Sequence, residues 1–247
     1  MTDSYIHSNV KQVESRIAEA ALRAGRRPDD VTLVAVCKTF PAGAVIQAYM
    51  AGVRNFGENR VSEAQNKIPE VSAGLSGDGP TWHMVGHIQS RKTSDVVACF
   101  DFVHSVDRLK VANRLSRSAA EAGRSLPVLL ECNVSGEDSK FGFDVRAWES
   151  ERACRKAFFD AVDEILRLPA ICVRGLMTMA PLVAEPASVR PVFASLRGLR
   201  EELCERFPET EWGELSMGMT NDFDVAVEEG ATLVRVGRAI FGRRDVV

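Results

Sequence analysis

The chain has 247 residues, of which 45% are hydrophobic and 26% are charged, and its formal net charge is -3 at pH 7. This balance is typical of a globular protein with enough apolar material for a core. Lysines and arginines are scattered among the acids, so nothing favours nucleic-acid binding. The first residues show no signal-peptide pattern, and no apolar run approaches membrane-spanning length. We therefore expect a cytoplasmic protein with no nucleic-acid or membrane partner.

The six cysteines are widely spaced and include no C-x-x-C pair. Such cysteines are typical of small buried side chains in a reducing compartment. The pattern predicts neither a disulfide framework nor a zinc site.

Apolar periodicity divides the chain into alternating elements after an opening helix. The apolar residues of that helix recur at spacings of three and four: Val10, Val13, Ile17, Ala20 and Ala24. Eight strands are expected, at Leu33–Cys37, Val53–Phe56, Trp82–Val85, Phe102–His104, Val128–Asn133, Cys172–Met177, Glu214–Met217 and Leu233–Val236. Seven helices are expected among them, at Ala42–Ala51, Arg60–Lys67, Arg91–Ala98, Arg108–Ala122, Trp148–Leu168, Ala187–Arg206 and Asp222–Glu229. Asp107 is predicted to cap the fourth helix and Gly123 to end it.

Strands that alternate with helices indicate parallel βα units. Eight such units in about 250 residues are typical of a closed (β/α)8 barrel, or TIM barrel. The main competitor is an open doubly wound sheet, but this normally has a glycine-rich turn where the chain has Lys38-Thr39-Phe40-Pro41. No Pro/Gly/Ser-rich linker divides the sequence. We predict a single domain over residues 1–247, an α/β TIM barrel with an extra N-terminal helix.

Lys38 follows an apolar run at the carboxyl end of the first predicted strand. Functional groups of a TIM barrel collect at this end of its strands. An amine held against apolar surface has a lowered pKa, and its neutral form attacks aldehydes, including pyridoxal 5′-phosphate (PLP). The alternative for a single lysine is a solvated surface residue, and Lys38 alone does not decide between the two.

The ends of the seventh and eighth strands predict an anion site. Ser216 offers a hydroxyl and Gly218 a closely approachable backbone before a helix. Gly237 permits the same approach after the last strand, and Arg235 adds a cation. Either loop alone would fit an ordinary turn or salt bridge. Both loops, in one barrel with a strand-end lysine, favour a phosphate site.

Other chemically suggestive residues have structural interpretations. His83 and His87 lie on a strand and its following loop, so we expect no metal pair, and His83 is predicted to be a core residue. Lys140 is expected in a solvated loop. Four methionines are expected to pack around a pocket mouth, at Met177, Met179, Met217 and Met219.

Several motifs together resemble the YggS/PROSC family of PLP-binding proteins, also called pyridoxal phosphate homeostasis proteins. The resemblance covers nearly the whole chain. Its motifs are Val34 to Lys38, Phe56-Gly57-Glu58-Asn59, Trp82 to Gln89, Asn133 to Gly142, Arg174 to Met177, Leu215 to Asp222 and Arg235 to Gly242.

The resemblance implies a barrel similar to the N-terminal domain of alanine racemase, with PLP bound as an aldimine to Lys38. It implies that Asn59 lies near the cofactor ring and that Met177 lines the pocket. The residues implied around the phosphate are Ser216, Met217, Gly218, Arg235 and Gly237. For Arg235, contact with the phosphate and contact with the pyridine nitrogen both stay open. Arg91 departs from the asparagine of many members, which leaves the role of position 91 open.

The family implies PLP homeostasis, in which the protein binds, buffers and hands on PLP without robust catalytic turnover. An alanine racemase needs a second base, a tyrosine from a C-terminal β-domain of the partner subunit. We expect none here, because the chain ends after the eighth unit and neither Tyr5 nor Tyr49 follows a strand. The alternatives are a weak PLP-dependent amino-acid racemase and a cofactor-free Schiff-base aldolase. Besides PLP, the partners considered are apo forms of PLP-dependent enzymes, and the expected assembly is a monomer or weak dimer.

Overall fold

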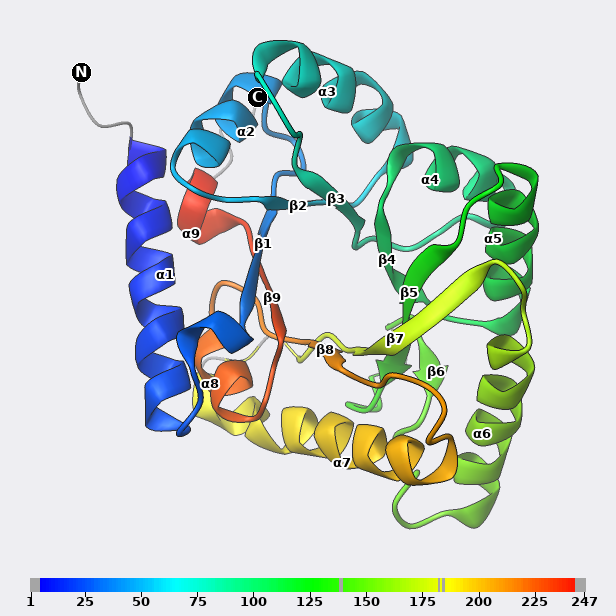
Figure 1. The fold of residues 1–247 in the computed structure, drawn as a ribbon. Coiled ribbons are helices and arrows are strands. Elements are labelled where there is room, and N and C mark those ends of the chain that lie inside the picture. Colours follow the sequence, from blue (N-terminus) through cyan, green and yellow to red (C-terminus); the bar gives the residue numbers. More distant parts are fainter. Residues whose placement is uncertain (1–4, 138–139, 182, 184, 243–247) are drawn as a thin grey trace.

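Eight parallel strands close into a barrel in the computed structural model, which describes residues 5–137, 140–181, 183 and 185–242 (Figure 1). The barrel strands are β1 (Thr32–Val36), β2 (Asn55–Glu58), β3 (Thr81–Met84), β4 (Phe102–Val106), β5 (Leu126–Asn133), β7 (Ile171–Met177), β8 (Glu214–Ser216) and β9 (Leu233–Val236). They follow one another in chain order around the barrel, and parallel pairing of β9 with β1 closes it. A short strand β6 (Phe143–Asp144) pairs with the end of β5. The predicted TIM barrel is confirmed.

A helix follows each barrel strand and covers its outer face (Figure 1). These helices are α2 (Ala42–Met50), α3 (Val61–Gly74), α4 (Thr93–Cys99), α5 (Leu109–Glu121), α6 (Arg152–Leu166), α7 (Arg190–Arg206), α8 (Phe223–Glu228) and α9 (Arg238–Phe241). Short 3-10 helices precede β1, α4 and α7: η1 (Pro28–Asp30), η2 (Ser90–Lys92) and η3 (Pro186–Val189). The ends of the predicted domain, residues 1–4 and 243–247, lie outside the described residues.

Side chains alternate between the inside of the barrel and its helix-covered wall, as parallel strands require. The inside holds an apolar layer formed by Val34, Leu129, Met177 and Leu233, with Phe102 and Met179 packed against it. The residue two positions after Leu233 faces inward again and is Arg235, and the corresponding residue after Leu129 is Glu131. Apolar and polar side chains therefore share the barrel interior.

Strand β2 and helix α3 both extend beyond their predicted ends. Strand β2 begins after the predicted Val53 and continues to Glu58, whose fully buried carboxylate pairs with Lys67. Helix α3 does not end at Lys67 but continues to Gly74 through Pro69, because Val71 extends its buried face.

The starts of α5 and α6 also differ from the prediction. Asp107 does not cap α5. Its carboxylate pairs with His87 and Arg108, and Arg108 occupies the N-cap position. Helix α6 begins at Arg152 instead of Trp148, since residues 146–150 form turns. Gly123 follows the end of α5 with a φ of +64°, a conformation that glycine adopts without strain.

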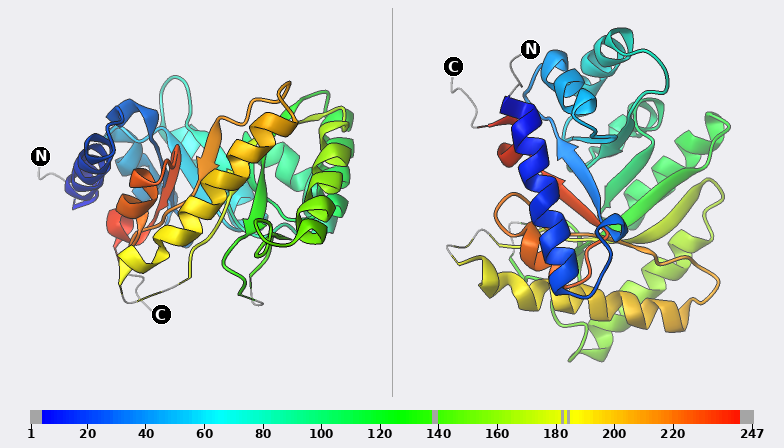
Figure 2. Two further views of the ribbon diagram at one scale, coloured as in Figure 1. Left: turned by 90° about the horizontal axis from the view of Figure 1, so that it is seen from below. Right: turned by 60° about the vertical axis from the view of Figure 1, so that its left-hand side comes forward.

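The extra N-terminal helix α1 (Tyr5–Arg23) packs on the outside of the barrel beside α8, α9 and α2 (Figure 2). Its apolar stripe is buried there, including Ile6, Val10, Val13 and Ile17. At its N-terminal end the Asn9 side-chain amide donates to the Ile240 carbonyl over 2.9 Å. The predicted extra helix is thus confirmed, except that Ala24 lies beyond its end and is exposed.

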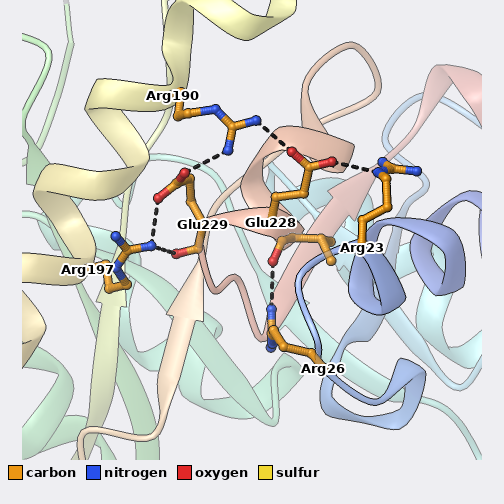
Figure 3. A network of polar contacts seen from close by, with 7 residues as sticks. Arg23, Arg26, Arg190, Arg197, Glu228 and Glu229 are labelled. Carbon is orange, nitrogen blue, oxygen red and sulfur yellow. Dashed lines mark hydrogen bonds and ion pairs between the residues drawn. The ribbon is translucent and has the colours of Figure 1, made fainter.

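An ion-pair network joins α1 to the last helices of the barrel (Figure 3). The Glu228 carboxylate accepts from Arg23 at 2.8 Å and from Arg190 at 2.6 Å. Glu229 pairs with Arg190 at 2.7 Å and with Arg197 at 2.6 Å. The hydrogen bond from Arg190, opposed by partial burial and reinforced by Arg23, lowers the pKa of Glu228. The network links three helices that are distant in sequence.

We expect Glu228→Gln to reduce the free energy of unfolding at pH 7 by ~0.5–1 kcal/mol, the usual range for a partly exposed ion pair. Because the pKa of Glu228 is lower in the folded state, its stabilisation is present above the ordinary carboxyl pKa of 4.5 and is lost as pH falls through the folded value. Urea unfolding at pH 7 and at about pH 3 tests this, with the exposed Glu205→Gln on α7 as control. A variant equally destabilised at both pH values would contradict it.

Candidate functional site

A cavity of about 290 Å³ opens at the carboxyl ends of the barrel strands, the end at which TIM barrels carry their sites. Residues that end or follow β1, β2, β3, β7, β8 and β9 enclose it. The lining residues are Val36, Lys38, Phe40, Asn59, Val85, Met179, Ala180, Pro181, Met219, Thr220, Asn221, Asp222, Arg235, Gly237 and Arg238. Apolar walls with a few polar groups are typical of a site for a small organic ligand.

Lys38 enters the cavity from a turn directly after β1, which ends at Val36 and not at the predicted Cys37. Its side chain is partly buried. The next residue, Thr39, has a φ of +70°, in the left-handed region that a β-branched residue adopts at a cost of about 1 kcal/mol or more. Phe40 then stacks on Phe241 of α9 with ring centroids 5.1 Å apart. The turn that carries Lys38 is therefore strained and is packed against the end of the chain's last helix.

Small residues shape the rim of the cavity after β8 and β9. A Cβ on Gly237 would lie 3.0 Å from the Val36 carbonyl oxygen, so a side chain there would crowd the backbone after β1. Gly218, with a φ of +92°, lets α8 approach, since a Cβ there would lie 2.9 Å from the Phe223 Cα. The loop from Gly218 to α8 is fixed by Asp222, whose carboxylate accepts the Met219 N–H at 2.6 Å. These two loops supply Thr220 to Asp222 and Gly237-Arg238 to the lining.

Arg235 places a buried cation at the floor of the cavity. Its guanidinium donates to the Ser216 hydroxyl at 2.5 Å and to the Thr178 carbonyl at 2.8 Å. Burial lowers the pKa of Arg235 to about 10, against the opposing influence of Glu131 and Asp222, and the group stays protonated at neutral pH. Its charge is therefore permanent, and two hydrogen bonds fix its orientation.

A chain of hydrogen bonds runs from Arg235 through the barrel interior. Arg235 donates to Ser216, the Ser216 hydroxyl lies 2.8 Å from His104 Nδ1, and His104 Nε2 lies 2.9 Å from His83 Nδ1. His83 Nε2 lies 3.0 Å from the Asn55 side-chain oxygen. Burial lowers the pKa of His83 to about 4 and that of His104 well below 6.5, so both rings are neutral at pH 7. Because arginine only donates and the amide oxygen only accepts, every bond must be donated in the direction from Arg235 to Asn55.

This direction determines what Ser216 can do. Its single hydroxyl proton is donated to His104, so Ser216 serves as an acceptor for Arg235 and has no proton left for an anion. Ser216 does not line the cavity, and neither do Met177, Met217 and Gly218. Met177 is fully buried in the apolar layer inside the barrel, whereas Met217 is buried in the outer core. Of the residues predicted around the site, the cavity lining brings together Lys38, Asn59, Arg235 and Gly237.

Asn59 follows β2 and is held by a close backbone contact. A Cβ on Gly86 would lie 2.3 Å from the Asn59 carbonyl oxygen, so glycine at position 86 lets the loops after β2 and β3 touch. The Asn59 side-chain oxygen is buried and has no hydrogen-bond partner among the described residues. An unpaired buried amide oxygen in a cavity wall is suited to receive a ligand donor.

Other predicted residues lie near the cavity mouth or away from it. Lys140 is not in a solvated loop: its amine donates to the Met179 carbonyl at 3.0 Å and to Ser135 Oγ at 3.1 Å. Met179 and Met219 line the cavity, as expected of methionines at a pocket mouth. His83 is confirmed as a core residue. Arg91 is exposed in η2.

Glu131 is a titratable residue of the barrel interior that the sequence analysis did not identify. Burial, and next the nearby Asp107, raise the pKa of Glu131 to about 7, whereas Arg235 opposes the shift. One of its carboxyl oxygens is buried without a partner among the described residues. The available sequence signal was a glutamate inside the otherwise apolar run Leu129-Leu130-Glu131-Cys132.

Metal-binding clusters and membrane-spanning helices are both absent from the described residues. No cluster of three or more His, Cys, Asp or Glu in this part of the chain could hold a metal ion. No helix in the described ranges has both the length and the apolar character to cross a membrane. All six cysteines carry free thiols, but the prediction of small buried side chains is wrong for part of the set, since Cys37 and Cys132 are buried and Cys204 is exposed.

The fold and this strand-end site define the class of the protein. Residues 8–245 match the family described as "Alanine racemase, N-terminal domain", and the chain belongs to that family. Within it, the chain belongs with the pyridoxal phosphate homeostasis proteins. It is 43% identical over 244 residues to the protein of that name from Pseudomonas aeruginosa, covering 98% of this chain and 97% of that one. It is 39% identical over 242 residues to the one from Vibrio alginolyticus, covering 98% and 99%.

Solved structures show the same architecture. PipY of Synechococcus elongatus without PLP superposes with a TM-score of 0.79 at 38% identity, covering 93% of this chain and 99% of that chain. PipY with PLP bound gives a TM-score of 0.75 at 39% identity, covering 92% and 100%. An alanine racemase of Clostridium difficile shares the fold, with a TM-score of 0.66 at 13% identity over 96% of this chain and 56% of that one.

We expect Glu131→Gln to stabilise the protein at neutral and alkaline pH. The folded pKa of about 7 lies above the ordinary value of 4.5, so the folded state holds the proton more tightly and the unfolding free energy falls as pH rises between these values. The introduced glutamine mimics the protonated form and removes this penalty, by roughly 2–3 kcal/mol above pH 7 and by nothing below the ordinary carboxyl pKa. Urea unfolding against pH measures the difference, with the exposed Glu121→Gln as control. Equal pH profiles for Glu131→Gln and the wild type would contradict it.

Proposed function

We propose that the protein binds PLP covalently through Lys38 and acts in intracellular PLP homeostasis, as a carrier and buffer without robust turnover. The observation that carries the proposal is one cavity that holds a lysine amine, an arginine floor and two glycine-shaped rim loops. Membership of the homeostasis-protein family and the PLP-bound PipY structure support it. We further propose that residues 1–247 form a single PLP-binding domain.

The residues present fit such a ligand. When bound, PLP supplies an aldehyde that condenses with an amine and loses water. Lys38 is the lysine in the cavity lining and provides the amine. The close approach that Gly237 permits, with Arg238 beside it, suits the phosphate at the rim after β9. The unpaired oxygen of Asn59 suits a donor on the ligand near Lys38.

For Arg235, we propose contact with the ring side of the ligand and not with its phosphate. Arg235 lies within β9, two residues before the rim at Gly237, and its guanidinium points into the barrel towards Ser216 and Thr178. A phosphate held at the rim would lie above this level. Ser216, Met217, Gly218 and Met177 then act indirectly, since Ser216 orients Arg235 and Gly218 positions the rim loop.

The lining offers little for a second proton-transfer step. Both tyrosines of the chain are engaged elsewhere: Tyr5 donates to the Phe241 carbonyl at 3.3 Å and Tyr49 to the Asp78 carbonyl at 2.6 Å. Asp222 is occupied by the Met219 N–H. On this basis we propose a carrier and not an efficient racemase. We also propose that it is cytoplasmic and monomeric or weakly dimeric, and that its partners are PLP and the apo forms of PLP-dependent enzymes.

We expect the purified protein to be yellow and Lys38→Ala to lose the visible absorbance. Borohydride reduction of the wild type, followed by peptide mass spectrometry, should place the pyridoxyl group on the peptide that contains Lys38. The exposed Lys110→Ala is the control and should keep the colour. A wild-type protein that takes up no PLP would refute the proposal, and trapping of a ketose phosphate instead of PLP would favour the aldolase alternative.

We also expect no steady interconversion of amino-acid enantiomers by the PLP-loaded protein. Lys38 provides one proton-transfer group, and the described lining supplies no tyrosine for the opposite face. Chiral chromatography of alanine and other amino acids after long incubation measures this, with an alanine racemase as positive control. Sustained turnover that disappears in Lys38→Ala would replace the carrier with the racemase alternative.

A further inference from the structure

The two peptide groups that flank Lys38 are both held by side chains of α3. On the N-terminal side, the Cys37 carbonyl accepts a hydrogen bond from Lys67 Nζ at 2.8 Å. On the C-terminal side, the Thr39 N–H donates to the Glu63 carboxylate. Glu63 and Lys67 lie one helical turn apart and pair with each other at 3.0 Å. One ion pair on α3 therefore contacts the backbone on both sides of Lys38.

The Lys67 end of this contact is buried and fully engaged. The Lys67 side chain is only 6% exposed, and its amine also pairs with the fully buried carboxylate of Glu58. That carboxylate lies 3.3 Å from the Cys37 thiol, which donates to it. Burial by itself lowers the pKa of Lys67, but Cys37, Glu58 and Glu63 outweigh it and raise the pKa. Lys67 is therefore a permanent cation held in one position.

The turn after β1 needs support from outside because the backbone conformation of Thr39 is one that threonine disfavours. Thr39 has a φ of +70° and is the one non-glycine residue with positive φ in the described part of the chain. A β-branched residue disfavours this conformation, so an unsupported turn would relax towards the ordinary regions. Within the turn, the Phe40 N–H donates to the Cys37 carbonyl at 3.1 Å, the same carbonyl that Lys67 holds. Relaxation at Thr39 would rotate the Lys38–Thr39 peptide and redirect the Lys38 side chain.

We propose that Glu63 and Lys67 are positioning residues for Lys38: they hold its two flanking peptide groups so that the strained turn keeps the amine in the cavity. The pair does not line the cavity and contacts no part of the ligand space. The expected effect on PLP affinity rests on the proposed function, whereas the support of the turn by Glu63 and Lys67 does not.

The decisive variant is Glu63→Ala, which removes the acceptor of the Thr39 N–H. Glu63→Gln keeps a side-chain oxygen at the same place, and the exposed Glu70→Ala on the same helix is the matched control. All are full-length proteins, compared at a temperature where circular dichroism shows each to be folded. The first measurement is amide hydrogen exchange of Thr39 in the PLP-free protein, and the second is PLP affinity from the absorbance of the bound cofactor.

We expect Glu63→Ala to speed Thr39 exchange and to weaken PLP binding about tenfold or more, because small misplacements of a reacting group are costly. Glu63→Gln and Glu70→Ala should stay within about twofold of the wild type, as expected for a contact that depends on an acceptor oxygen. Adding Thr39→Asn to Glu63→Ala should restore much of the affinity, since asparagine tolerates positive φ. A general loss of stability would not be rescued in this way.

The outcomes separate this inference from the proposed function. Unchanged Thr39 exchange and wild-type PLP affinity in Glu63→Ala would overturn the positioning role, as would an equal loss in Glu63→Gln. If the wild type takes up no PLP, the proposed function fails, and Thr39 exchange alone then decides whether Glu63 holds the turn. Lys67→Met alone leaves the buried Glu58 carboxylate without its cation, so this variant is expected to unfold easily. The double variant Glu58→Gln/Lys67→Met therefore tests the contact of Lys67 with the Cys37 carbonyl. We expect it to lose as much PLP affinity as Glu63→Ala.

Discussion

The pairing of β9 with β1 is the interaction on which the site depends, because it closes the barrel. Its register sets Val34 opposite Arg235 and Ala35 opposite Val236. The turn that carries Lys38 and the rim residue Gly237 follow the ends of these two neighbouring strands, so both residues line the same cavity. A slip of this register would turn inward-facing residues to the outer wall and separate the amine from the arginine floor. Closure thus fixes the fold and assembles the cavity in the same step.

The hydrogen bonds of the polar groups inside the barrel show which of these groups serve the structure. Burying Arg235 and two histidines is unfavourable unless each polar atom finds a partner. The chain from Arg235 to Asn55 gives each its partner, with one direction of donation throughout. Glu131 and Asn59, in contrast, keep buried oxygens without partners among the described residues. Of these two, Asn59 lines the cavity, where a ligand donor can reach its oxygen, while the paired chain holds Arg235 in one orientation.

The sequence predicted the barrel well because apolar alternation is a local signal, and the strand ends then showed where the site lies. It could not show which of the strand-end residues line the cavity. Met177 and Ser216 sit at predicted strand ends but do not line the cavity. Met217 is buried in the outer core, since which side a strand-end residue faces depends on the exact pairing. Glu131 was hidden in an apolar run. The contact of Lys67 with the Cys37 carbonyl joins a helix to a different strand's end, which no local pattern reveals.

The extra helix α1 covers the outside of the barrel where β9 pairs with β1. The last barrel helix, α9, spans only Arg238–Phe241 and is too short to cover the joint between β9 and β1. Helix α1 packs on α9, α8 and α2, the helices that follow the three strands around that joint. Its apolar stripe supplies the outer layer that α9 lacks, and the Glu228–Glu229 arginine network ties it to α8 and α7 (Figure 3). Because Lys38 and Gly237 leave the barrel at this joint, the helix supports the cavity from the outside without contacting it.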